Sequence, residues 1–114
     1  MTPDERTALN EAVCKRLGWE SETRRVLHKA YDHTFWKPPG HDRFDQWERP
    51  DFTSDWNAVY RWIVPAVIEM EAGERELFVD EMMTFVAERI NDDWPDFLDA
   101  TPEDYCRAFL KVTK

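Results

Sequence analysis

The stretch that decides the fold is residues 75–90, RELFVDEMMTFVAERI, in which apolar side chains return every three or four positions. This spacing is typical of a helix with one apolar face. The residues on that face are Leu77, Phe78, Met82, Phe85, Val86 and Ile90, widened by Val79 and Met83. We therefore predict a helix over about 75–90 that packs its apolar face against the rest of the chain.

Two further helices are marked by their capping residues. Thr2 is a good N-cap and Pro3 fits the first helical position, while Gly18 is a natural stop, so the first helix is predicted at about 3–17. Thr101 and Pro102 begin the last helix in the same way.

The middle of the chain is less regular. A helix that starts near Thr53 or Ser54 contains Pro65, which predicts a kink or break there. Residues 22–31 fit a helix, whereas Thr34–Trp36 fits a short strand. The predicted fold class is mainly α with four to five helices in one domain, 1–114, and the alternative is α+β with a small reduced sheet.

Composition narrows the function classes. Apolar residues make up 42% of the chain, but no apolar run approaches the roughly 20 residues of a membrane span. The N-terminal residues lack the apolar region of a signal peptide, so we expect a cytoplasmic protein, in a host cell, with no membrane partner. Cys14 and Cys106 are then expected to be reduced, and both fall on predicted buried faces.

Negative charge is concentrated in the later part of the chain. Residues 66–104 hold thirteen acidic and two basic residues, net −11, whereas the whole chain carries −9. This excess disfavours direct nucleic-acid binding and favours a partner with a basic surface. The competing interpretation is that the acidic residues only keep the protein soluble.

No reactive centre is evident. The sequence contains no Gly-rich phosphate loop and no Gly-x-Ser-x-Gly turn. His28, His33 and His41 lack zinc-ligand spacing, and the acidic residues lack the spacing of a calcium loop. We therefore expect a protein that is not an enzyme and that has no metal and no cofactor.

Several segments together resemble a known family. They are LNEAV (9–13), LGW (17–19), WKPPG (36–40), PDFTSDWNA (50–58) and ATPEDYCRAFL (100–110). Their order resembles the phage ABA-sandwich domain proteins, which are small proteins of phages and prophages, largely without assigned function. The resemblance implies an accessory phage protein and strands after the central helix, but residues 72–90 depart from that pattern because they fit a helix. The family's sheet is therefore expected either to be reduced to short strands near Thr34–Trp36 and Phe97–Leu98 or to be absent.

The main hypothesis is a non-catalytic protein that binds and modulates or inhibits a host protein, such as a defence or nucleic-acid-handling protein. Acidic and aromatic residues without a basic neighbour suggest the contact residues. These are Trp47, Asp92, Asp93, Trp94, Asp96, Phe97 and Asp99.

Two alternatives stay open. The first is a nucleotide-binding sponge, in which aromatic residues in 36–40 and 47–56 stack on the ligand and Arg43, Arg49 and Arg61 contact its phosphate. The second is a self-assembling structural phage component, which would be a homo-oligomer.

Overall fold

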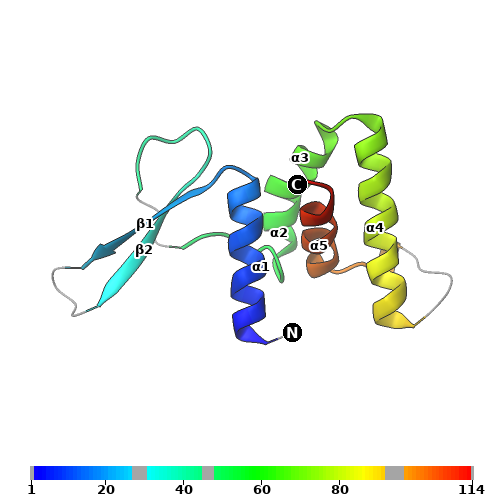
Figure 1. Cartoon of the computed structure of the whole chain (residues 1–114), viewed down its shortest axis with the longest axis horizontal. Coiled ribbons are helices and arrows are strands. Elements are labelled where there is room, and N and C mark those ends of the chain that lie inside the picture. The colour runs from blue at the N-terminus through cyan, green and yellow to red at the C-terminus, as the bar shows by residue number, and fades with distance from the viewer. Residues whose placement is uncertain (1, 27–30, 45–47, 92–96, 114) are drawn as a thin grey trace.

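The secondary-structure elements are spread along one long axis, with a strand hairpin at one end and a helix at the other (Figure 1). The computed structural model describes residues 2–26, 31–44, 48–91 and 97–113. The helices are α1 (Pro3–Arg16), α2 (Trp56–Ala58), α3 (Val64–Ile68), α4 (Ala72–Ile90) and α5 (Pro102–Val112), with a π-helical segment at Val59–Ile63 and a 3-10 turn at Phe97–Asp99. The strands are β1 (Glu20–Arg25) and β2 (Asp32–Lys37). The prediction of a mainly helical chain with a small sheet is confirmed.

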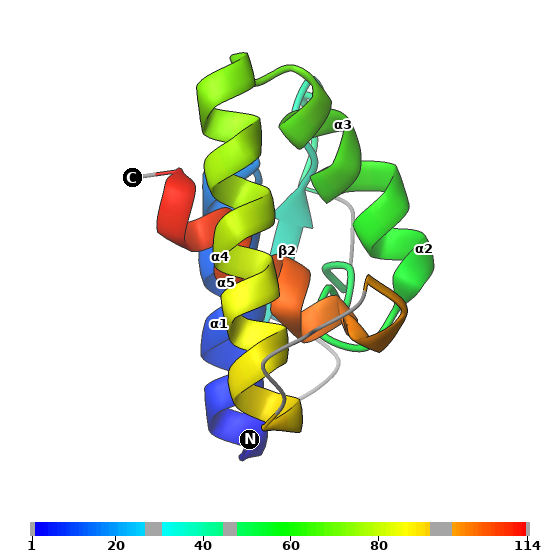
Figure 2. The ribbon, with the colours of Figure 1, turned by 90° about the vertical axis from the view of Figure 1, so that its right-hand side faces the viewer.

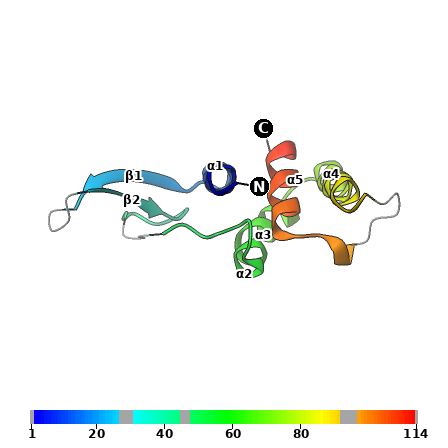
Figure 3. The ribbon, with the colours of Figure 1, turned by 90° about the horizontal axis from the view of Figure 1, so that it is seen from below.

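Helix α5 is the centre of the helical body. It lies between α1 and α4 and runs across both, so that α1 and α4 are seen end-on where α5 lies in the plane (Figure 3). Its start is fixed by a capping box, in which Thr101 and Asp104 satisfy each other's backbone N–H groups. The buried core that α5 joins to its neighbours includes Val13, Cys14, Phe52, Ile63, Phe78, Met82, Val86, Cys106 and Phe109. Within the described ranges, no helix is both long enough and apolar enough for a membrane span.

Strands β1 and β2 form an antiparallel hairpin that projects from the helical body (Figure 1). Every residue of β1 is exposed, and its register places Glu20 opposite Lys37 and Arg25 opposite Asp32. The Glu20–Lys37 ion pair has an N–O distance of 2.9 Å. Cross-strand pairs of this kind stabilise a strand that has no apolar residue of its own. The helix option for residues 22–31 is therefore wrong for Glu22–Arg25.

Three other details differ from the sequence predictions. Phe97–Leu98 is the start of a 3-10 turn and not a strand. The chain stays helical through Pro65, because the π-helical segment before it changes the hydrogen-bond spacing and Val64 N–H donates to the Val59 carbonyl. Leu77 and Val79 are 48% and 36% exposed, so the apolar face of α4 is narrower than predicted.

A buried polar junction joins α1 to the segment before α2. Asn10, which is 4% exposed, accepts a hydrogen bond from the Phe52 backbone N–H at 2.7 Å. Its Nδ2 donates to Asp51 Oδ1 at 3.0 Å, and the same carboxylate accepts from the hydroxyls of Thr53 and Ser54. The segments LNEAV and PDFTSDWNA are thus tied to each other, and the junction fixes α1 relative to the helical body.

This junction predicts how stability depends on pH. Burial alone would raise the pKa of Asp51, but hydrogen bonds from Ser54, Thr53 and Asn10 outweigh it and lower the pKa to about 2. The pKa of Asp51 in the folded protein lies below its value of about 3.9 in the unfolded chain. The carboxylate therefore contributes its full stabilisation above about pH 3.9, and this contribution is lost as the pH falls towards 2. The Asp51 side chain is in contact with water, so we expect a contribution of only about 1 kcal/mol.

The variant Asp51→Asn isolates this contribution. It should be less stable than the wild type by about 1 kcal/mol near neutral pH, and the difference should shrink as pH falls from about 4 to about 2. Urea unfolding of both proteins across that range measures it. A difference that stays constant down to the lowest pH would contradict this assignment of the carboxylate.

Candidate functional site

Helix α4 forms one end surface of the molecule. Its inner side packs on α5 through Phe78, Met82 and Val86, which recur every fourth residue. In the end-on view α4 is the element nearest the viewer, with α5 and α1 behind it (Figure 2). The outward side of α4 is therefore an exposed surface along most of the helix.

Exposed carboxylates lie along α4 before and after an exposed leucine, Leu77. Glu74 and Asp80 lie three residues before and after Leu77, so they are its neighbours along the helix surface. Glu76 and Glu88 are also exposed on α4, and both Glu74 and Glu88 line hollows together with α5 residues. We call the surface formed by Glu74, Glu76, Leu77, Asp80 and Glu88 the acidic face. None of its four carboxylates forms an ion pair with another described residue.

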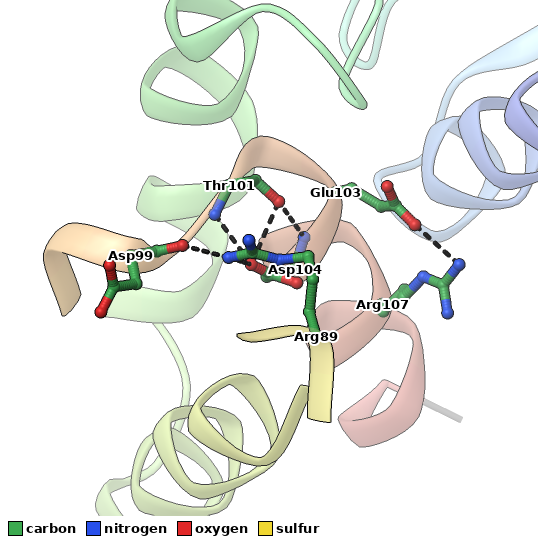
Figure 4. A network of polar contacts seen from close by, with 6 residues as sticks. All are labelled: Arg89, Asp99, Thr101, Glu103, Asp104 and Arg107. Atoms are coloured by element: carbon green, nitrogen blue, oxygen red, sulfur yellow. Dashed lines mark hydrogen bonds and ion pairs between the residues drawn. The ribbon is translucent and has the colours of Figure 1, made fainter. Parts of the chain in front are cut away.

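Arg89 is one of the two basic residues in 66–104, and it pairs with Asp104 of α5. Its positive charge therefore does not neutralise the carboxylates of the acidic face. Its Nη2 donates to Asp104 Oδ2 at 3.1 Å and to the backbone carbonyl of Asp99 (Figure 4). The Asp104 side chain is only 5% exposed and also accepts from the Thr101 N–H at 2.8 Å. The other basic residue, Arg75, lies on the flank of α4, where it lines a shallow hollow with Glu76, Val79 and Asp80.

Other carboxylates at this end of the molecule are already paired. Glu81 forms an ion pair with Lys111 at 3.1 Å, and Glu103 with Arg107 at 2.6 Å (Figure 4). Both basic residues come from α5. Ion pairing within the fold thus distinguishes Glu81, Glu103 and Asp104 from the carboxylates of the acidic face.

Most of the contact residues predicted from sequence are not placed. Trp47, Asp92, Asp93, Trp94 and Asp96 lie outside the described residues, and of Phe97 only the backbone is described. Asp99 is exposed at the same end of the molecule as α4, and its carbonyl accepts from Arg89. Charge counting located the acidic residues 66–104 but did not single out Glu74, Glu76, Asp80 and Glu88. Asp80 falls opposite Phe78, Met82 and Val86 on a helical wheel, a signal that could have found it, whereas Glu74 lies in the same i, i+4 row as Phe78 and gives no such signal.

The two cysteine side chains are enclosed in the core. Cys14 and Cys106 are both fully buried, and burial raises the pKa of each thiol to about 12. The Cys106 thiol donates to the Phe52 carbonyl at 3.1 Å. A reactive thiolate needs an accessible, electropositive setting, so both cysteines serve packing. In the ranges that the structure describes, no three His, Cys, Asp or Glu side chains converge to form a metal site.

Comparison with protein-family models, with curated proteins and with solved structures found no match for this chain.

Proposed function

We propose that this protein is a small accessory protein of the phage type that binds a host protein with a basic surface, through its acidic face, and thereby modulates or inhibits it. The observation that carries the proposal is the set of four exposed carboxylates of α4 that form no ion pair with another described residue, two of which, Glu74 and Asp80, adjoin the exposed Leu77. They lie at the end of the molecule opposite the hairpin, so the negative field is one-sided (Figure 1).

Two physical effects favour binding through the acidic face, namely electrostatic steering and apolar anchoring. A one-sided negative field accelerates encounter with a positively charged surface and disfavours acidic partners. An exposed apolar side chain within a charged rim follows the usual anatomy of a protein interface. Leu77, which is 48% exposed, supplies the apolar centre.

Solubility is the competing explanation, and it depends on net charge alone. A solubility role requires negative charge anywhere on the surface, whereas binding requires it on α4. Two variants with equal net charge therefore separate the explanations. The first removes the charge of the acidic face with Glu74→Gln, Glu76→Gln, Asp80→Asn and Glu88→Gln. The control removes four charges from the hairpin region with Glu20→Gln, Glu22→Gln, Asp32→Asn and Asp42→Asn, all exposed positions.

The experiment is affinity capture from host lysate at about 50 mM and about 500 mM salt, followed by quantitative mass spectrometry. We expect the wild type and the hairpin control to retain the same basic protein at low salt, and the α4 variant to retain roughly tenfold less. Retention should fall at high salt. Equal retention by both variants, or equal loss in both, would show that the location of the charge does not matter and would refute the proposal.

A further inference from the structure

A hollow of about 410 Å³ lies between the residues that follow α1 and β2, the loop before α2 and the π-helical segment Val59–Ile63. Its walls are the indole rings of Trp19 and Trp62 together with two proline rings. The polar groups that reach it are His41, Glu48, Arg49 and Arg61. Its volume is within the range of small-molecule binding sites.

Two buried donors at this hollow have no acceptor. Trp19 is 6% exposed, and its indole Nε1 makes no hydrogen bond to any described residue. The Nε of Arg49 is likewise buried without an acceptor in the described part of the chain. Buried polar atoms without a partner are rare in folded proteins. Because both atoms are donors, the group that would complete them is a hydrogen-bond acceptor.

The two arginines make the hollow an exception in an acidic protein. Neither Arg49 nor Arg61 forms an ion pair with a residue in the described ranges. Each guanidinium lies near an aromatic ring: Arg49 Cζ is 5.8 Å from the centre of Trp36, and Arg61 Cζ is 5.5 Å from the centre of Trp62. Such contacts orient the guanidinium plane, and arginine N–H groups match the geometry of phosphate oxygens.

The hollow also offers an aromatic surface. The rings of Trp19 and Trp62 meet edge to face with centroids 5.1 Å apart, and Trp62 is only half-buried. A planar ring can pack against the exposed part of such a pair. Glu48, the one carboxylate that lines the hollow among the described residues, can accept a hydrogen bond from a ring N–H or a sugar hydroxyl.

We propose that this hollow binds a mononucleotide, with the phosphate between Arg49 and Arg61 and the base against Trp62. The proposal goes beyond the partner-binding function, because the hollow and the acidic face lie on different elements. Three of the segments quoted for the family resemblance also contribute lining residues. Trp19 comes from LGW, Pro38 from WKPPG and Pro50 from PDFTSDWNA.

The test is a titration with ribonucleoside monophosphates, their cyclic counterparts, the matching nucleosides and inorganic phosphate. Tryptophan fluorescence and thermal shift of the full chain report binding. We expect at least one nucleotide to bind with a Kd of about 1–100 µM. The matching nucleoside and inorganic phosphate should each bind roughly tenfold more weakly, because each lacks one half of the recognition.

Four variants locate the site. Arg49→Met and Arg61→Met should each weaken binding roughly tenfold, and Trp19→Phe, which keeps a ring but removes the N–H, roughly threefold. Arg61 is exposed, so its variant should fold even if Arg49→Met does not. Arg43→Met is the matched control, because Arg43 is exposed and does not line the hollow.

The proposal is overturned if no nucleotide binds more tightly than about 1 mM. It is also overturned if Arg61→Met binds as well as the wild type, or if Arg43→Met loses as much affinity as Arg61→Met. Inorganic phosphate that binds as tightly as the best nucleotide would contradict the role of the aromatic rings.

Discussion

Replacing Asn10 with alanine should lower the free energy of unfolding by about 2–4 kcal/mol. The variant leaves the buried Phe52 N–H without an acceptor and removes one donor from Asp51. It also leaves a small cavity at a position that is 4% exposed. Because a domain of this size is stabilised by only about 5–15 kcal/mol, the loss should be visible as a large shift of the urea midpoint.

Thr7→Ala, one turn earlier on the same helix, provides the control. Thr7 is exposed, so its replacement should change stability by less than about 0.5 kcal/mol. If Asn10→Ala cost no more than this control, the Asn10–Asp51–Phe52 junction would not be what holds α1 on the helical body.

The second large effect is expected at the link between α4 and α5. Arg89→Met leaves the Asp104 carboxylate, 5% exposed, without its ion-pair partner (Figure 4). Removing one member of a fully buried pair costs about 3–5 kcal/mol. Because the Arg89 side chain is 40% exposed, we expect a smaller loss, about 2–3 kcal/mol, measured by urea unfolding. Arg75→Met, on the exposed flank of the same helix, should be nearly neutral.

A double-variant cycle distinguishes the ion pair from simple loss of packing. Asp104→Asn removes the charge that Arg89 neutralises. The loss of unfolding free energy in the double variant should therefore be smaller than the sum of the two single losses by roughly 1 kcal/mol or more. Additive losses would mean that Arg89 acts through its aliphatic stem alone.

The helices that the sequence predicts well are those whose signals are local. Thr2, Gly18 and Thr101 act within one turn of the chain, and the structure confirms the helices they bound, Pro3–Arg16 and Pro102–Val112. Strand β1 was not predicted because its residues carry no apolar pattern. Its stability comes from pairing with β2, and the partner Lys37 lies seventeen positions from Glu20.

The unpaired carboxylates of the candidate site also depend on contacts between residues that are distant in the sequence. Counting charges identifies residues 66–104 as acidic, but it does not tell which carboxylates remain unpaired. That depends on Lys111 and Arg89, which reach Glu81 and Asp104 only in the folded chain. The sequence analysis predicts Leu77 on the same apolar face as Phe78, yet adjacent residues on a helix point about 100° apart. Only the packing of α5 along one side decides that Phe78 is buried and Leu77 exposed.

The most direct test of the partner-binding claim is photo-crosslinking from within the acidic face. A photoreactive residue placed at Leu77 lies at the centre of that face, and the same residue placed at Ser21, exposed on β1, lies at the other end of the molecule. After illumination in host lysate, the variant labelled at position 77 should form a covalent product with a basic protein, and the variant labelled at position 21 should not. Products from position 21 alone, or no product from position 77, would contradict the account.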